Sequence, residues 1–221
     1  MTNYVSKYLR VYLVDDHDIV RQGLRDLLVP ATDIYVVGDS GSAREAARAI
    51  PELGIDVMVL DLRLQDGTGI EVCRAVRSVN PSISGLLLTS SGDDEALVAA
   101  ILAGAAGYVV KLTRSSDITA AIRKVGAGKS LIEPDTLERV SRQMLAAMDE
   151  LRPRLTDDEL QVLSEVIDGH TDAQIAERSG VPLDAATAQV SALVARLTDP
   201  MSPGFPAPGS AQAGKHRRSD S

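Results

Sequence analysis

The chain has 221 residues, a net charge of −8 and a pI of about 4.9, and 44% of its residues are hydrophobic. This length allows one or two domains with a sizeable core. The single cysteine, Cys73, excludes a disulfide framework and fits a reducing compartment. No apolar run reaches the ~18 residues of a membrane span, and residues 1–10 lack a signal-peptide core. We therefore expect a cytoplasmic protein, and the acidic charge argues against general affinity for nucleic acid.

Short apolar runs alternate with amphipathic or alanine-rich segments in the first 128 residues. The predicted strands are residues 9–14, 34–37, 56–60, 83–88 and 107–110, and the predicted helices are residues 18–29, 42–50, 70–79, 93–103 and 115–125. Asp18 is predicted to cap the first helix, Ile19 to lie on its apolar face, and residues 38–41 to form a turn. The alternation predicts an α/β fold, a five-stranded parallel sheet with helices on both faces.

Reactive side chains follow four of the predicted strands, namely Asp15, Asp16, Asp61, Thr89 and Lys111. In parallel sheets, ligands bind beyond the carboxyl ends of the strands. Clustered carboxylates are tolerated mainly around a cation, and oxygen ligands favour Mg²⁺ or Ca²⁺. Asp61 is then the candidate nucleophile that forms an acyl phosphate. Lys111 offers a positive charge and Thr89 a hydroxyl to the phosphoryl oxygens.

Each of these residues taken alone has a simpler interpretation. A pair of aspartates is usually a solvated turn, a threonine a helix cap and a lysine a surface residue. Tyr108, three residues before the lysine, is either a mobile ring or ordinary packing. His17 is more often a surface histidine than a ligand, and Cys73 is expected in the core. Phosphate acceptance is favoured only because residues of these types follow several predicted strands at once.

A second helical unit follows. Residues 133–150 are predicted to form a linker helix with an apolar stripe (Leu137, Val140, Met144, Leu145, Met148), and Arg152-Pro153-Arg154 breaks the chain. Thr156 to Glu159 forms a capping box before the first of three short helices. We predict a first domain at residues 1–130, a helical linker at 131–152, a helical domain at 153–200 and a disordered tail at 201–221.

Residues 9–128 resemble the receiver domains of two-component response regulators, which have the flavodoxin-like fold. The likeness runs through Val14-Asp15-Asp16-His17, Leu60-Asp61-Leu62-Arg63-Leu64, Asp66-Gly67-Thr68-Gly69, Leu88-Thr89-Ser90 and Gly104 to Lys111. The intervals are 45 residues from Asp16 to Asp61, 28 from there to Thr89 and 22 more to Lys111. Gln65 departs from the usual proline, which loosens the turn but removes no reactive group.

This resemblance implies that a sensor histidine kinase phosphorylates Asp61. It implies that Asp16, Asp61 and the carbonyl of Arg63 bind Mg²⁺ with Asp15 nearby. Thr89 and Tyr108 are implied to move on phosphorylation, while Lys111 contacts the phosphoryl group. The chain is then not an enzyme beyond self-catalysed phosphotransfer and autodephosphorylation. A dedicated aspartyl-phosphate hydrolase of the haloacid-dehalogenase type is disfavoured, because Arg63 stands where such enzymes have a second aspartate.

Residues 155–197 resemble the LuxR-type helix-turn-helix domain of NarL/FixJ regulators, and the whole chain looks most like the actinobacterial dormancy-survival branch. The likeness fails at the recognition helix. Where the family has Thr-Val-Lys, this chain has Ala185-Ala186-Thr187-Ala188-Gln189. From 155 to 200 there are two basic and nine acidic residues, a net charge of −7. The family's fourth helix, which commonly dimerises, is replaced by a Pro/Gly segment at residues 201–210.

Two functions stay open. The first is a phosphorylation-controlled transcription regulator, in which Thr187 or Gln189 contacts a base and Arg152, Arg154 and the basic tail contact phosphates. The second is a receiver whose output domain has lost DNA binding and acts through protein–protein interaction or as a phosphate sink. The charge predicts weak DNA binding at most. A homodimer and a heterodimer with another regulator are both open.

Overall fold

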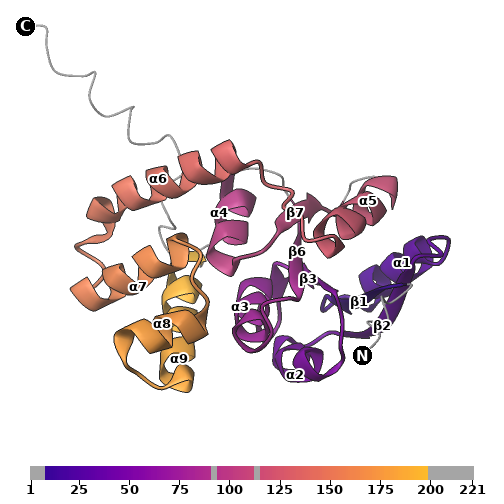
Figure 1. Ribbon diagram of the computed structural model, residues 1–221, viewed down its shortest axis with the longest axis horizontal. Coiled ribbons are helices and arrows are strands. Elements are labelled where there is room, and N and C mark those ends of the chain that lie inside the picture. Colours follow the sequence, from indigo (N-terminus) through magenta and orange to yellow (C-terminus); the bar gives the residue numbers. More distant parts are fainter. Residues whose placement is uncertain (1–7, 91–93, 112–114, 199–221) are drawn as a thin grey trace, which may run out of the picture.

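Residues 8–90, 94–111 and 115–198 are described by the structure, which is a computed structural model. Five parallel strands form one sheet in the order β2-β1-β3-β6-β7 (Figure 1). They are β1 (Leu9–Val14), β2 (Ile34–Ser40), β3 (Val57–Asp61), β6 (Ser84–Thr89) and β7 (Gly107–Val110). Every residue of β3 is buried, as expected for an aliphatic strand in the middle of a parallel sheet covered on both faces.

Helices cover both faces of this sheet. On one face α1 (Asp18–Leu28) and α5 (Ser115–Gly126) pack against strand residues such as Leu13 and Val59. On the other face lie α2 (Ala43–Ala49), its 3-10 extension η1 (Ile50–Glu52), α3 (Gly69–Val79) and α4 (Asp94–Ala103). Met58 and Leu60 face this second layer, because successive side chains of a strand point to opposite faces.

The register of the strands brings their carboxyl ends together at one edge. Val14 of β1 is level with Leu60 of β3, so Asp15 and Asp61 follow at the same height. Asp61 is level with Leu88 of β6, and Thr89 is level with Val110 of β7, which places Lys111 next to them. Side chains far apart in the sequence therefore meet at this edge.

Between residues 134 and 198 the structure describes four further helices. They are α6 (Pro134–Leu151), α7 (Asp157–Ile167), α8 (Asp172–Ser179) and α9 (Leu183–Thr198). The predicted capping box at Thr156 is present, and a second one at Thr171 begins α8. α8 ends at Gly180, whose left-handed backbone (φ 69°) favours glycine.

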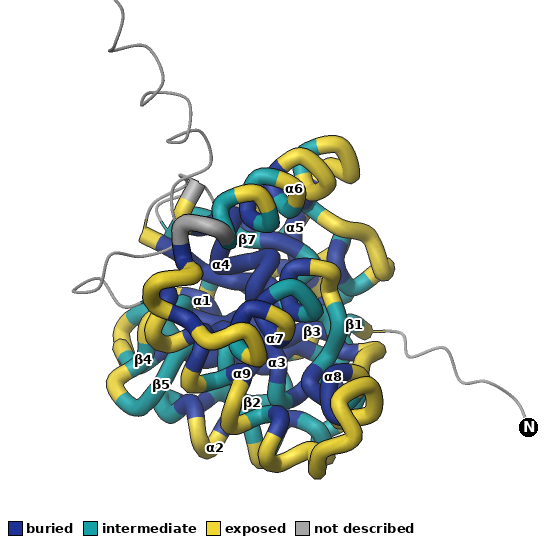
Figure 2. The backbone as a smooth tube through the Cα atoms, turned by 90° about the vertical axis from the view of Figure 1, so that its left-hand side faces the viewer, coloured by how far each residue is buried: buried dark blue, intermediate teal, exposed yellow. Residues whose placement is uncertain are grey.

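These helices pack on the α3–α4 side of the sheet, and one hydrophobic core continues through both parts of the chain. Figure 2 shows the buried segments of α3, α4 and α7 together in the middle of the molecule, surrounded by exposed loops. Val140 and Met144 of α6 are buried in this core. A buried ion pair between Arg74 of α3 and Asp172 of α8 joins the two parts.

Four local predictions were wrong. Residues 38–40 belong to β2 instead of a turn, because they pair with residues 12–14 of β1. Ile19 is 83% exposed, since it lies off the stripe of α1 that buries Leu24 and Leu28. Asp18 is the first residue of α1, whose cap is His17. Leu137 of α6 is exposed and does not belong to the buried apolar stripe of that helix.

The predicted tail, with its basic residues 215–218, lies outside the described residues. The predicted domain limits at residues 130, 152 and 200 stay predictions. None of the described helices is both long enough and apolar enough to cross a membrane.

Candidate functional site

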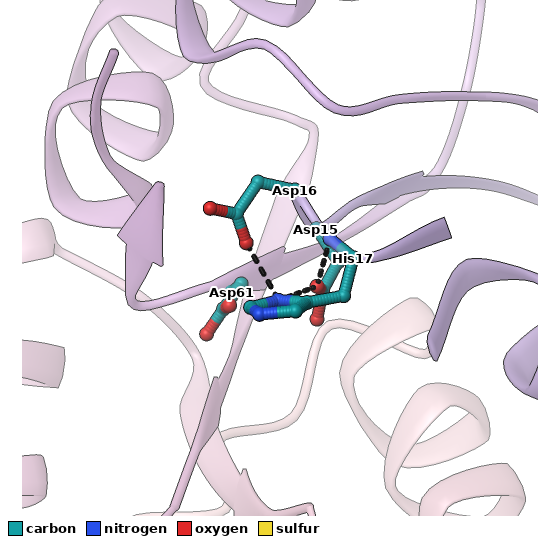
Figure 3. A group of neighbouring side chains, drawn as sticks. All are labelled: Asp15, Asp16, His17 and Asp61. Atoms are coloured by element: carbon teal, nitrogen blue, oxygen red, sulfur yellow. Dashed lines mark hydrogen bonds and ion pairs between the residues drawn. The ribbon is translucent and has the colours of Figure 1, made fainter. Parts of the chain in front are cut away.

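Three carboxylates and an imidazole converge at the carboxyl edge of the sheet (Figure 3). Ligand atoms of Asp15, Asp16, His17 and Asp61 all lie within 4.8 Å of one another. Asp15 and Asp61 are buried, whereas the His17 side chain is 64% exposed. The imidazole Nδ1 lies 2.7 Å from an Asp16 oxygen and 3.1 Å from an Asp15 oxygen. The first three residues leave β1 and the fourth ends β3, so the parallel pairing of these strands creates the cluster.

Lys111 supplies the positive charge in this cluster. Its Nζ lies 2.7 Å from an oxygen of Asp15 and 2.8 Å from an oxygen of Asp61. Burial alone lowers the pKa of the lysine, but its hydrogen bonds to the two carboxylates reverse this effect and raise the pKa. The ammonium therefore stays charged and reaches the carboxylate of Asp61. Its contact with a phosphoryl group stays a prediction.

An open cleft of about 380 Å³ lies above Asp61. Its lining includes Asp16, Thr89 and Lys111 together with the loop after β3. Thr89 is buried at the end of β6. At the mouth, the Arg63 guanidinium lies 3.5 Å from the carboxylate of Glu95, which belongs to α4. The structure thus brings the predicted nucleophile, hydroxyl and lysine to one cleft.

Tyr108 does not line this cleft. It is half-buried beside a second cavity of about 340 Å³, together with Leu97 and residues 131–133 of the segment that leads to α6. Its neighbour in the sheet, Leu87 of β6, belongs to the core on the α4 side. The switching role of this ring stays a prediction.

The loop after β3 is fixed at Asp66, which sequence reasoning did not single out. The carboxylate accepts hydrogen bonds of 2.7 Å from the Ser42 hydroxyl and from the Ala43 backbone N–H at the start of α2. These bonds, led by the one from Ser42, hold the pKa of Asp66 below its usual value. An acid that caps a helix from another loop leaves no local sequence signal, although the Ser42-x-x-Glu45 pattern does mark the start of α2.

Gly69 closes the same loop over Asp61. A methyl group at this glycine would overlap the backbone carbonyl of Asp61. We expect Gly69→Ala to destabilise the fold by about 1–3 kcal/mol, the usual cost of overpacking, measured by urea unfolding. Gly23→Ala is the control, because this exposed glycine of α1 has open space around it. It should stabilise the protein by roughly 0.5–1 kcal/mol. Equal effects of the two substitutions would contradict the close approach.

Burial is the main cause that raises the pKa of the Asp61 carboxyl, and Lys111 opposes it. The folded state therefore holds a proton here more readily than the unfolded chain, and the ionised form costs stability above the folded-state pKa. We expect Asp61→Asn to raise the midpoint of thermal unfolding at pH 7 without divalent cations. The gain should disappear as the pH falls to the unfolded pKa of about 4. Asp26→Asn, at an exposed position of α1, should change little. A lower midpoint in Asp61→Asn would show that the loss of the lysine contact outweighs burial.

The acidic cleft and the strand order can be compared with known proteins. The family model of the response regulator receiver domain matches residues 11–123. The chain belongs to the response regulator family. The matched residues include every side chain named above as part of the cleft.

The relatives of this response regulator are similar along most of the chain. It is 42% identical over 191 residues to the DNA-binding transcriptional activator DevR/DosR of Mycobacterium tuberculosis, which covers 86% of this chain and 88% of that protein. It is 33% identical over 189 residues to the response regulator protein VraR of Staphylococcus aureus, with 86% and 90% covered.

Solved structures show the same fold. A two-component response regulator of the LuxR family from Aurantimonas sp. SI85-9A1 matches with a TM-score of 0.54 and 33% identity, covering 62% of this chain and 97% of that chain. The RcsB response regulator of Salmonella typhimurium matches with a TM-score of 0.52 over 85% of this chain and 91% of its own, and its 23% identity supports the fold alone.

The predicted DNA-contacting residues of this response regulator lie on α9. Gln189 is exposed and Thr187 is half-buried. The two basic residues between 155 and 200 both contact acids: Arg178 lies 2.8 Å from Glu165, and Arg196 pairs with Glu159. The described helices of this part therefore present little uncompensated positive charge.

Proposed function

We propose that a sensor histidine kinase phosphorylates this response regulator on Asp61 and that the phosphorylation state controls its C-terminal helices. The observation that carries the proposal is the position of the Asp61 carboxylate in an open cleft, within 2.8 Å of the Lys111 ammonium. A carboxylate oxygen of Asp61 attacks the phosphorus of the phosphohistidine, and the P–N bond breaks. The kinase histidine leaves as neutral imidazole, because its other ring nitrogen already carries a proton. The product is an acyl phosphate.

The charges around Asp61 fit this transfer. Lys111 neutralises part of the charge of the phosphoryl oxygens, and the hydroxyl of Thr89 donates to another oxygen. Asp16, Asp61 and the carbonyl of Arg63 would hold Mg²⁺ with Asp15 nearby, and this oxygen-rich donor set suits a hard cation. Bound there, Mg²⁺ supplies positive charge to the phosphoryl group. We infer that the catalytic activity of the chain is limited to this self-phosphorylation and to autodephosphorylation.

The output we propose is transcription regulation. The most extensive support is the 42% identity, over both parts of the chain, to a protein named as a DNA-binding transcriptional activator. In the phosphorylated form, Thr89 and Tyr108 would turn inward and shift the population toward a state that frees α9 for DNA. Gln189 is the exposed side chain best placed to contact a base.

A selection experiment tests this output. Full-length protein, with and without prior treatment with acetyl phosphate and Mg²⁺, is mixed with a pool of random 30-base-pair duplexes at 50 to 200 mM salt. We expect phosphorylated protein to enrich a common sequence, weakly and with marked salt dependence. If no sequence is enriched at any of these salt concentrations, DNA-directed output is refuted.

The charge of the C-terminal part favours a second candidate. With a net charge of −7 between residues 155 and 200, this surface repels phosphates. The response regulator would then act by pairing with a second copy or with another regulator, or by drawing phosphate away from a kinase. Mixing it with a kinase and a second regulator separates these possibilities, because a phosphate sink slows phosphorylation of the other regulator without forming a complex with it.

A further inference from the structure

Arg74 of α3 has a buried guanidinium at the boundary between the receiver and the C-terminal helices. The side chain is 5% exposed, and Nε donates to an Asp172 carboxylate oxygen at 2.8 Å. One terminal nitrogen donates to the backbone carbonyl of His170 at 2.9 Å, and the other to that of Leu102 at 2.9 Å. One side chain therefore joins α3, the last turn of α4 and the turn before α8.

The guanidinium of Arg74 is the countercharge of the buried Asp172 carboxylate. The Asp172 side chain is 1% exposed, and its second carboxylate oxygen has no hydrogen-bond partner among the described residues. Its backbone N–H donates to the hydroxyl of Ser78 on α3 at 3.0 Å. Removing Arg74 leaves a buried carboxylate without a countercharge, which a folded protein avoids by exposing the group to water. Here water reaches the carboxylate when α8 leaves α3.

The helix α4 connects this ion pair to the phosphorylation cleft. Glu95 and Ala96, in its first turn, line the cleft above Asp61. Leu102, in its last turn, presents its carbonyl to Arg74. The two points are separated by roughly 10 Å along one helix at about 1.5 Å per residue. A displacement of α4 at the cleft therefore carries an acceptor of Arg74 with it.

We propose that the Arg74–Asp172 ion pair is a latch that holds α7–α9 on the receiver, and that phosphorylation of Asp61 weakens it through α4. The coupling half of this inference rests on the proposed function, whereas the latch half does not. Both halves place the point of control on α3, where Arg74 meets α8.

The latch is tested first in unphosphorylated full-length protein by hydrogen–deuterium exchange. We expect Arg74→Met and Asp172→Asn each to increase exchange in the peptides of α3 and α8 at least tenfold, while the peptide of β3 stays protected and shows that the receiver is folded. Arg77→Met is the matched control on the same helix, because Arg77 is half-buried and its bond to the Ile83 carbonyl is a long 3.4 Å.

The double variant decides whether the pair acts as a unit. Because each single substitution already breaks the pair, we expect the double variant to exchange no faster than the faster single variant. If the increases in exchange rate of the two single variants multiply in the double variant, the two residues do not act as a pair and the latch is overturned. It is also overturned if the single variants exchange no faster than Arg77→Met. If Arg74→Met loses protection of β3, the conservative Asp172→Asn still gives the answer.

The coupling is tested by treating wild-type protein with acetyl phosphate and Mg²⁺ and confirming the phosphate by mass. We expect α8 exchange to rise at least fivefold in wild type and to change less in Arg74→Met, whose latch is already open. Phosphorylated Asp61 with unchanged α8 exchange would refute the coupling and leave the proposed phosphotransfer standing. Absence of phosphorylation would refute that function and, with it, the coupling, and leave the latch result unaffected.

Discussion

Asp61→Asn is expected to abolish uptake of phosphate from acetyl phosphate and Mg²⁺, which in the wild-type chain adds about 80 Da as one acyl phosphate. The amide that replaces the carboxylate keeps the shape of the side chain but is not a nucleophile. Asp61 both lines the cleft and touches Lys111, whereas Asp15, which also touches Lys111, is fully buried and does not line it. Intact-mass spectrometry measures the result directly, since the product is stable for a short time at neutral pH.

Two further variants sharpen this result. Lys111→Ala should slow labelling by ~10²-fold, the scale of removing one preorganised charge from a transfer site. Asp26→Asn, an exposed residue on α1, should label like the wild type. Labelling that persists in Asp61→Asn would place the acceptor elsewhere and remove the basis of the proposed function.

Lysines on the exposed face of α9 should raise the affinity for DNA. Ala185, Ala188 and Ala192 are exposed, and replacing all three with lysine changes the net charge of residues 155–200 from −7 to −4. Affinity for DNA falls as salt rises, and each new contact with a phosphate makes the slope of log affinity against log salt more negative by about 0.9. Three contacts predict a gain on the order of a thousandfold near 50 mM salt. Fluorescence anisotropy of phosphorylated full-length protein with a random duplex measures it.

Glutamine at the same three positions is the control for this gain. It has similar length and good helix propensity but no charge. If the lysine variant binds no better than the glutamine variant, and its salt dependence is unchanged, then α9 does not face DNA in this response regulator. That outcome would favour output through protein contacts.

The sheet and the cleft were largely predictable because both depend on strong sequence signals. Buried parallel strands are continuous aliphatic runs, and their carboxyl ends meet at one edge whatever the loops do. For that reason the sequence alone predicts that Asp61, Thr89 and Lys111 lie at one edge of the sheet. Tyr108 belongs to the same sequence motif as Lys111 but does not line the cleft, because its side chain lies on the α4 side of β7.

The errors arise where tertiary contacts override local preference. Gly38 and Ser40 are typical turn residues, yet they belong to β2. A side chain at Gly38 would overlap the ring of Tyr12, so the glycine is needed to let β1 and β2 pair closely. Asp66 caps a helix 23 residues earlier in the chain. Arg74 and Asp172, 98 residues apart, look like ordinary surface charges on amphipathic helices until packing buries both.

Cys73 lies beside Arg74 on α3, fully buried against Gly85 of β6. Burial raises the pKa of its thiol to about 12, so the thiolate that reacts with alkylating reagents is almost absent in the folded protein. Modification of this thiol thus requires α3 to leave the sheet. Its labelling rate under native conditions reports the free energy of that opening. A detachment of α8 that leaves α3 in place would not change this rate. The labelling rate of Cys73 therefore distinguishes partial unfolding of the receiver from undocking of its C-terminal helices.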